Sequence, residues 1–168
     1  MQRRTLLTVG AATGVLLALA GGTIALMTPA RRQGELTPPA RQMLLAIAQA
    51  VLGEMLPADG ATRSRALAGH LVRIQGTIAG MPPAMQSEVD ELITIVSSAP
   101  GRLALIGLTT DWQQARPEQV AEALQGMRTS TLAVRQQAYH ALRDMTNASW
   151  FADPSTWPSI GYPGPRAL

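Results

Sequence analysis

Two histidines, His70 and His140, are the side chains of this chain best suited to proton transfer or metal binding. The positions one helical turn from His70 hold no carboxylate or second histidine, and His140 has only Asp144 there, which is typical of an ordinary pair on a helix surface. The absence of cysteine excludes disulfides, iron–sulfur clusters, thiolate zinc sites and covalently attached haem. We therefore assign no catalytic, cofactor-binding or metal-binding residue and expect no cofactor in this chain.

The remaining chemical signals are equally sparse. The chain has no nucleophile-elbow, phosphate-loop, zinc-protease or dinucleotide-binding motif. The carboxylates of Glu88, Asp90 and Glu91 are more typical of a solvated helix face than of paired catalytic acids. An independent small enzyme is thus disfavoured, and the sequence favours a function exerted through partners.

The first residues carry the most specific motif, an export signal. Arg3 and Arg4 are followed by the apolar Leu6 and Leu7, and the 26 residues from Thr5 to Ala30 carry no charge. This pattern predicts a twin-arginine leader that binds the twin-arginine export machinery and delivers the protein to the periplasm.

The fate of the leader is left open by the sequence. Thr28-Pro29-Ala30 is a poor match to the small-x-small pattern of a cleavage site. A helix over residues 5–30, at about 1.5 Å per residue, is also long enough to anchor the protein in the inner membrane. We divide the chain into a signal or anchor at 1–32, a helical domain at 33–153 and a tail at 154–168.

The charge distribution argues against nucleic acid as a partner. Four of the 14 basic residues lie in the first 32 positions, and the rest of the chain holds 10 arginines against 11 acidic residues. The domain therefore lacks the positive field that phosphate binding needs.

The body of the chain has the apolar spacing of helices, and proline and glycine separate them. No segment shows the alternation of a half-buried strand. We predict an all-α bundle of five or six helices. The expected segments begin at Thr37, near Thr62, at Pro83, at Arg102, at Pro117 and at a cap formed by Ser130 or Thr131.

The tail departs from this pattern. It contains or adjoins four of the six aromatic residues of the chain, Trp150, Phe151, Trp157 and Tyr162, interleaved with prolines and glycines. Such a segment is expected to lie extended against something, either against the protein's own core or against a partner. We take these four residues as partner-binding candidates, with Trp150 and Phe151 nearer the last helix of the chain.

Four stretches also resemble a known family. They are residues 44–52 (LLAIAQAVL), 98–102 (SAPGR), 139–146 (YHALRDMT) and 157–165 (WPSIGYPGP). With the leader, they resemble the small subunit of exported flavin-dependent sugar and alcohol dehydrogenases, of the gluconate 2-dehydrogenase subunit 3 and sorbitol dehydrogenase small-subunit type. The resemblance covers most of the chain, but none of these stretches is catalytic.

The resemblance implies a non-catalytic accessory subunit. In that family a large, GMC-type flavoprotein subunit carries FAD and the chemistry, and the small subunit supports its folding and its co-export. A multihaem cytochrome c often accepts the electrons. The alternative is an independent, membrane-anchored periplasmic adaptor or scaffold.

Replacing Arg3 and Arg4 together by lysine should leave the protein, and any partner bound to it, in the cytoplasm. The physical reason is that the export machinery recognises the arginine pair rather than positive charge alone. Cell fractionation followed by immunodetection measures this. Normal periplasmic levels of the double variant, with export blocked instead by inhibition of the general secretory route, would refute the twin-arginine assignment.

Overall fold

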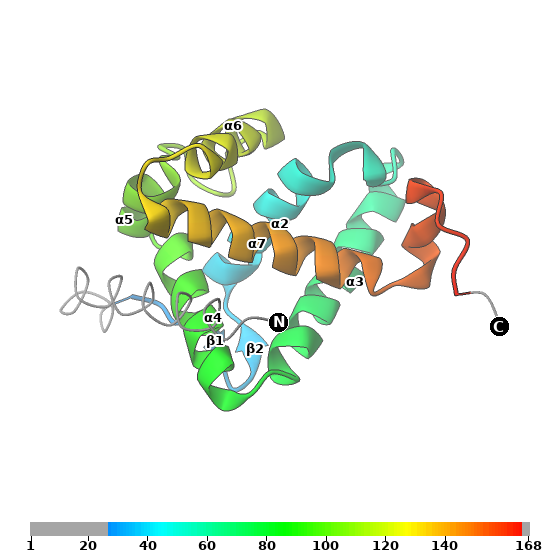
Figure 1. Ribbon diagram of the computed structural model, residues 1–168, viewed down its shortest axis with the longest axis horizontal. Helices are drawn as coiled ribbons and strands as arrows, with labels where there is room; N and C mark the ends of the chain where they lie inside the picture. Colours follow the sequence, from blue (N-terminus) through cyan, green and yellow to red (C-terminus); the bar gives the residue numbers. More distant parts are fainter. Residues whose placement is uncertain (1–26, 166–168) are drawn as a thin grey trace.

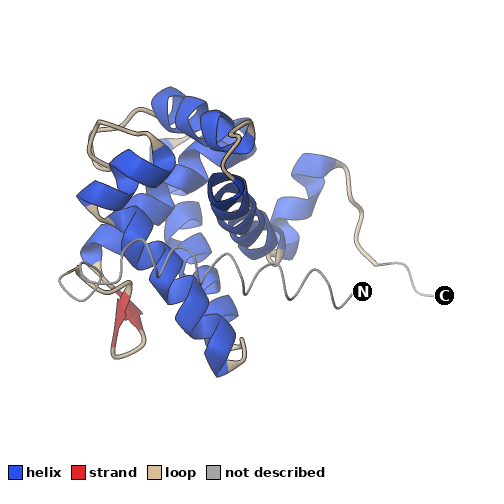
Figure 2. Cartoon of the chain, turned by 60° about the vertical axis from the view of Figure 1, so that its left-hand side comes forward, coloured by secondary structure: helices blue, strands red, loops and turns tan. Residues whose placement is uncertain are grey.

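The computed structural model describes residues 27–165, and the predicted leader up to residue 26 and residues 166–168 lie outside this range. The described part is all-α apart from one short hairpin, which confirms the predicted fold class (Figures 1 and 2). The elements are β1 Arg31–Arg32, β2 Glu35–Leu36, α2 Pro38–Leu52, η2 Gly53–Met55, α3 Gly60–Ala79, α4 Pro83–Ser97, α5 Ala99–Gly101, η3 Arg102–Ile106, α6 Pro117–Arg128, α7 Ala133–Phe151 and η4 Pro154–Ile160. Of these, η2 and η4 are 3₁₀ helices, and η3 is a π-helical turn.

Helix α2 lies at the centre of the fold. It contacts α3, α4, α6 and α7, and Figure 1 shows α7 crossing in front of it. Met43, Leu44 and Ile47 are completely buried, while the alanines at positions 40, 46 and 48 let neighbouring helices approach closely. The main core forms around this helix from Ile74, Ile78, Ile93, Val96, Leu124, Met127 and Leu142.

Most helix boundaries follow local signals. Proline occupies the first turn of α2, α4 and α6, where its missing N–H costs no hydrogen bond. Two predicted starts differ by a few residues. Helix α3 begins at Gly60, where the carboxylate of Asp59 caps it. Helix α7 begins at Ala133 rather than directly after Ser130 or Thr131. The Ser130 hydroxyl does not cap the helix, because it accepts a bond from the Leu132 N–H.

The sequence did not predict the short hairpin β1–β2, which spans residue 32, the predicted end of the leader. Arg31 pairs with Leu36 in antiparallel register, and the turn uses the positive φ angles of Gln33 and Gly34. The Arg31 guanidinium donates to both carboxylate oxygens of Asp90 on α4, each at 2.7 Å. Asp90 is therefore paired and partly buried, not freely solvated as its sequence context suggested.

The segment between α4 and α6 packs closely against α4 and α7. The predicted helix at Arg102 exists as η3, and the Arg135 guanidinium of α7 donates to the carbonyls of Leu105 and Ile106 at its end. Arg102 is itself buried and donates to Asp111 at 2.8 Å. A Cβ atom on Gly101 would lie 1.9 Å from the carbonyl oxygen of Ile95, so only glycine fits there.

Gly101→Ala should therefore lower the free energy of unfolding by at least about 2 kcal/mol, because the backbone of α4 cannot move aside without breaking its own packing. Gly126→Ala is the matched control, since a Cβ at this α6 position meets nothing within 4 Å. It should raise stability by about 0.5–1 kcal/mol through reduced freedom of the unfolded chain. Urea titration followed by circular dichroism measures both, and equal midpoints for the Gly101 variant and the unmodified protein would contradict this packing.

Candidate partner-binding surface

The two histidines lie in different environments, one buried and one exposed. The His70 ring is fully buried between α3 and α7, with its centroid 5.9 Å from that of Trp150, and neither ring nitrogen has a hydrogen-bond partner. His140 is exposed on α7, where its ring meets that of Tyr139. The neighbouring Asp144 accepts a bond from Arg143. Among residues 27–165, no cluster of three or more histidine or acidic side chains could hold a metal ion.

Burial, and secondarily the positive charge of Arg73, lower the pKa of His70 to about 4. The imidazole is therefore neutral at physiological pH. Its complete burial beside the Trp150 ring gives it the properties of a core residue. It supplies edge-to-face packing for Trp150 rather than proton transfer.

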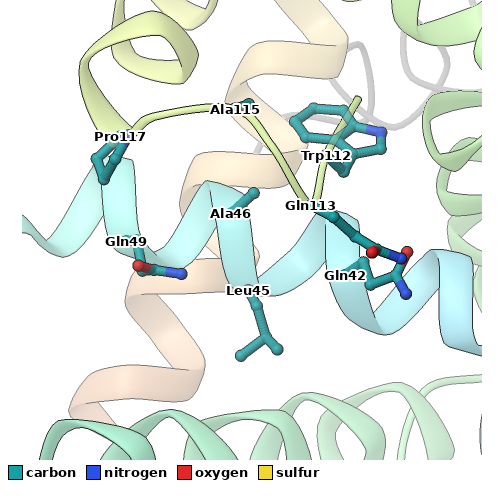
Figure 3. A pocket seen from close by; sticks show the side chains of 8 residues that line it. All are labelled: Gln42, Leu45, Ala46, Gln49, Trp112, Gln113, Ala115 and Pro117. Atoms are coloured by element: carbon teal, nitrogen blue, oxygen red, sulfur yellow. The ribbon is translucent and has the colours of Figure 1, made fainter. Parts of the chain in front are cut away.

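A pocket of about 300 Å³ lies between α2 and the segment that leads into α6 (Figure 3). Its lining contains no ionisable side chain, so it offers no acid, base or nucleophile. Figure 3 shows three glutamines arrayed along α2 and the crossing segment. The lining residues are Gln42, Leu45, Ala46, Gln49, Trp112, Gln113, Ala115 and Pro117.

The tail is a folded unit rather than the extended segment that the sequence predicted. Residues Pro154–Ile160 form the 3₁₀ helix η4, capped by the Asp153 carboxylate, which accepts bonds from the Ser155 N–H and hydroxyl. Proline excludes a regular α-helix, but its fixed φ suits a short 3₁₀ turn, which explains the difference. Beyond Gly161, with a φ of 70°, residues 162–165 have no regular structure.

Arg73 of α3 holds this unit to the body. Its guanidinium donates to the Ser149 carbonyl at 2.8 Å and to Asp153 at 3.0 Å, so one side chain joins α3 to the end of α7 and to the start of η4. Hydrogen bonds from Ser155, with a smaller contribution from Arg73, lower the pKa of Asp153. The Asp153 cap is therefore charged at neutral pH.

Trp157 organises the rest of the tail. Its indole N–H donates to the Phe151 carbonyl at 2.8 Å, and its ring centroid is 5.2 Å from that of Tyr162. Gly164 lies against the indole, where an added Cβ would approach a ring carbon to 3.3 Å. The Tyr162 N–H donates to the Trp157 carbonyl at 3.1 Å, which closes the turn.

The four predicted aromatic anchors therefore have different environments. Trp150 is only 3% exposed and packs in a second core cluster with Leu52, Leu56 and Leu67. Because it is enclosed by its own chain, we withdraw it as a partner-binding residue. Phe151 packs, partly buried, against the same cluster. Trp157 is also partly buried, and Tyr162 remains 44% exposed.

Sequence reasoning missed Ile160, which is 53% exposed. Residues three apart in a 3₁₀ helix lie one above the other, so Ile160 and Trp157 share a face of η4. We define the tail surface as Trp157, Ile160 and Tyr162. It lies at the right-hand end of the molecule in Figure 1, opposite α5. The sequence signal for Ile160 was an aliphatic side chain isolated among prolines and glycines.

The predicted export residues Arg3, Arg4, Leu6 and Leu7 lie outside the described residues. Between residues 27 and 165, the helices are too short or too polar to cross a bilayer. The structure thus brings together only the tail part of the predicted site.

The free energy of unfolding should fall by about 3 kcal/mol as the pH drops from 6.5 to about 4. The folded-state pKa of His70 is depressed, so the unfolded chain takes up the proton first, and the stability that neutral His70 contributes is complete above pH 6.5. His70→Phe should flatten this part of the profile. The exposed His140→Phe serves as control, and an unchanged profile in the His70 variant would show that another group causes the loss.

Comparison of the chain with models of protein families, with curated proteins and with solved structures finds no match. The interpretation of the tail surface therefore depends on its own geometry and on the sequence patterns around it.

Proposed function

We propose that this protein is a non-catalytic accessory subunit of a periplasmic, flavin-dependent dehydrogenase of the GMC type that oxidises a sugar or an alcohol. It supports folding of the catalytic subunit and carries that subunit through the twin-arginine route. FAD belongs to the catalytic partner, and a multihaem cytochrome c is the expected electron acceptor of the complex. The protein acts in the periplasm, either free or anchored in the inner membrane.

The tail surface is the observation that carries this proposal. Large apolar side chains exposed together at one end of a small domain are typical of interfaces. Trp157 and Tyr162 already contact each other, and hydrogen bonds to Phe151 and Trp157 hold the tail backbone. Because the tail is already folded, binding a partner to this surface costs less conformational entropy than ordering an unstructured arm would.

The rest of the chain supports a role in assembly rather than in chemistry. The core histidine is buried and neutral, and the described pocket has no ionisable lining residue. The twin-arginine route transports folded complexes, so a single leader can serve two chains. A domain that binds a leaderless flavoprotein before export fits both the leader and the tail surface.

Ile160→Asp and Tyr162→Ala should each weaken association with the dehydrogenase subunit by about 2 kcal/mol or more, because anchors at the centre of an interface dominate its affinity. Both side chains are substantially exposed, so the melting temperature of the isolated chain should change little. The measurement is co-purification of flavoprotein with the tagged chain from the native periplasm, followed by titration of the separated subunits.

Leu103→Ala is the matched control. Leu103 is 51% exposed and follows α5 at the opposite end of the molecule. It should leave association unchanged. Equal loss in all three variants would point to a general effect of surface hydrophobicity. Capture of only flavin-free proteins by the unmodified chain would favour the adaptor alternative over the dehydrogenase subunit.

A further inference from the structure

The pocket between α2 and the segment that leads into α6 has one wall built from a single face of a helix. Its α2 residues, at positions 42, 45, 46 and 49, follow helical spacing and therefore lie on the same side of α2. Gln42 and Gln49 are two turns apart, about 10 Å along the helix axis, and Leu45 and Ala46 lie between them (Figure 3). This wall is thus apolar in the middle and carries an amide at each end.

The opposite wall is held in place by the body of the protein. The indole N–H of Trp112 donates to the Val96 carbonyl at 3.1 Å, and the side chain is only 4% exposed. Because its one polar group is used in this bond, the indole offers only carbon surface to the pocket. The preceding Asp111 is paired with Arg102 at 2.8 Å, and its carbonyl accepts a bond from the Ala115 N–H. A ligand therefore meets a wall that is already formed, which lowers the entropy cost of binding.

The polar groups of the pocket are available to a ligand. Among the described residues 27–165, the side-chain amides of Gln42, Gln49 and Gln113 make no hydrogen bond to another protein group. Other glutamines of the chain do so, since the amides of Gln86 and Gln136 donate to backbone carbonyls of Met81 and Ser130. Gln42 and Gln49 are half-buried, and Gln113 is exposed on the facing segment. Three amides from two walls thus border one cavity with their donors and acceptors unused.

This combination selects a class of ligand. None of the eight lining side chains is ionisable, so a charged group bound there would lose water without gaining a counter-charge. Each amide both donates and accepts, as a hydroxyl group does. Leu45 and the Trp112 ring offer apolar surface to a carbon skeleton. The cavity volume of about 300 Å³ is that of a small-molecule site rather than a groove for a helix.

We propose that this pocket reversibly binds a small, neutral polyhydroxy compound of the sugar or sugar-alcohol class. Gln42 and Gln49 hold hydroxyl groups at the two ends of the ligand, and Gln113 holds one from the facing segment. The carbon skeleton packs on Leu45 and Trp112. The pocket shares no residue with the tail surface, so this inference goes beyond the accessory function and does not rest on it.

Saturation-transfer NMR on the purified full chain, kept in a sugar-free detergent, tests this binding. The neutral probes are sorbitol and glucose, and gluconate is their charged analogue of equal carbon number. At least one neutral probe should give a saturable signal. Gluconate should bind at least about tenfold more weakly, because its carboxylate finds no counter-charge in the lining.

Gln42→Leu and Gln49→Leu should each weaken binding of the neutral probe by about three- to tenfold, the loss expected for one neutral hydrogen bond. Leucine keeps the approximate size of glutamine and removes its polar groups. Gln114→Leu is the matched control, since Gln114 is exposed beside the pocket but does not line it. Thermal melts followed by circular dichroism confirm folding, and Gln113→Leu replaces either α2 variant that melts early.

Three results overturn the proposed site. They are no saturable binding of either neutral probe, an equal loss in the control and the lining variants, and tighter binding of gluconate than of the neutral probes. If neither probe binds and the lining variants instead lose the co-purified flavoprotein, the pocket is part of a protein interface and the polyol proposal is wrong. That last result supports the accessory function, so the two proposals fail separately.

Discussion

The burial of α2 on most of its sides is the constraint from which the rest of the structure follows. A helix surrounded by four others can carry polar groups only at its margins, and its Met, Leu and Ile side chains each contribute about 1.5–3 kcal/mol by leaving water. The centre of the described molecule is therefore a packed apolar core. Gln42 and Gln49, at the margin of α2, line the described pocket, and they bring amides rather than reactive groups.

Arginine–carboxylate pairs then attach the segments outside the long α-helices to this core. Arg31 holds the hairpin to α4 through Asp90, Arg102 holds the segment before α6 through Asp111, and Arg73 holds the tail through Asp153. All 14 basic residues of the chain are arginine. The planar guanidinium can donate to a carboxylate and a backbone carbonyl at once, as Arg73 does. The ammonium group of lysine is less well shaped for two such bonds.

The two ends of the described chain are consequently parts of the fold with distinct roles. In the segment before α2, Ala30 and Thr37 are buried, and hydrogen bonds from Ala30 and Arg31 join it to α4, so it belongs to the folded body. The tail is equally well hydrogen-bonded, yet it leaves Ile160 and Tyr162 exposed. This contrast between hydrogen-bonded backbone and exposed apolar side chains supports the proposal that a partner subunit binds at the tail surface.

The sequence by itself determined the all-α class and most helix limits, because proline, glycine and apolar spacing act within a few residues. It also identified the tail as unusual, from its aromatic and proline content. It could not show that Trp150 is enclosed while Ile160 is exposed, because that depends on where α3 and α7 meet. Nor could it show that Ala30 and Arg31 belong to the body, because their partners Thr94 and Asp90 lie far along the chain. Contacts at long sequence separation have no local signature, so the tertiary structure alone decided that Ala30 and Arg31 belong to the folded body and which residues make up the tail surface.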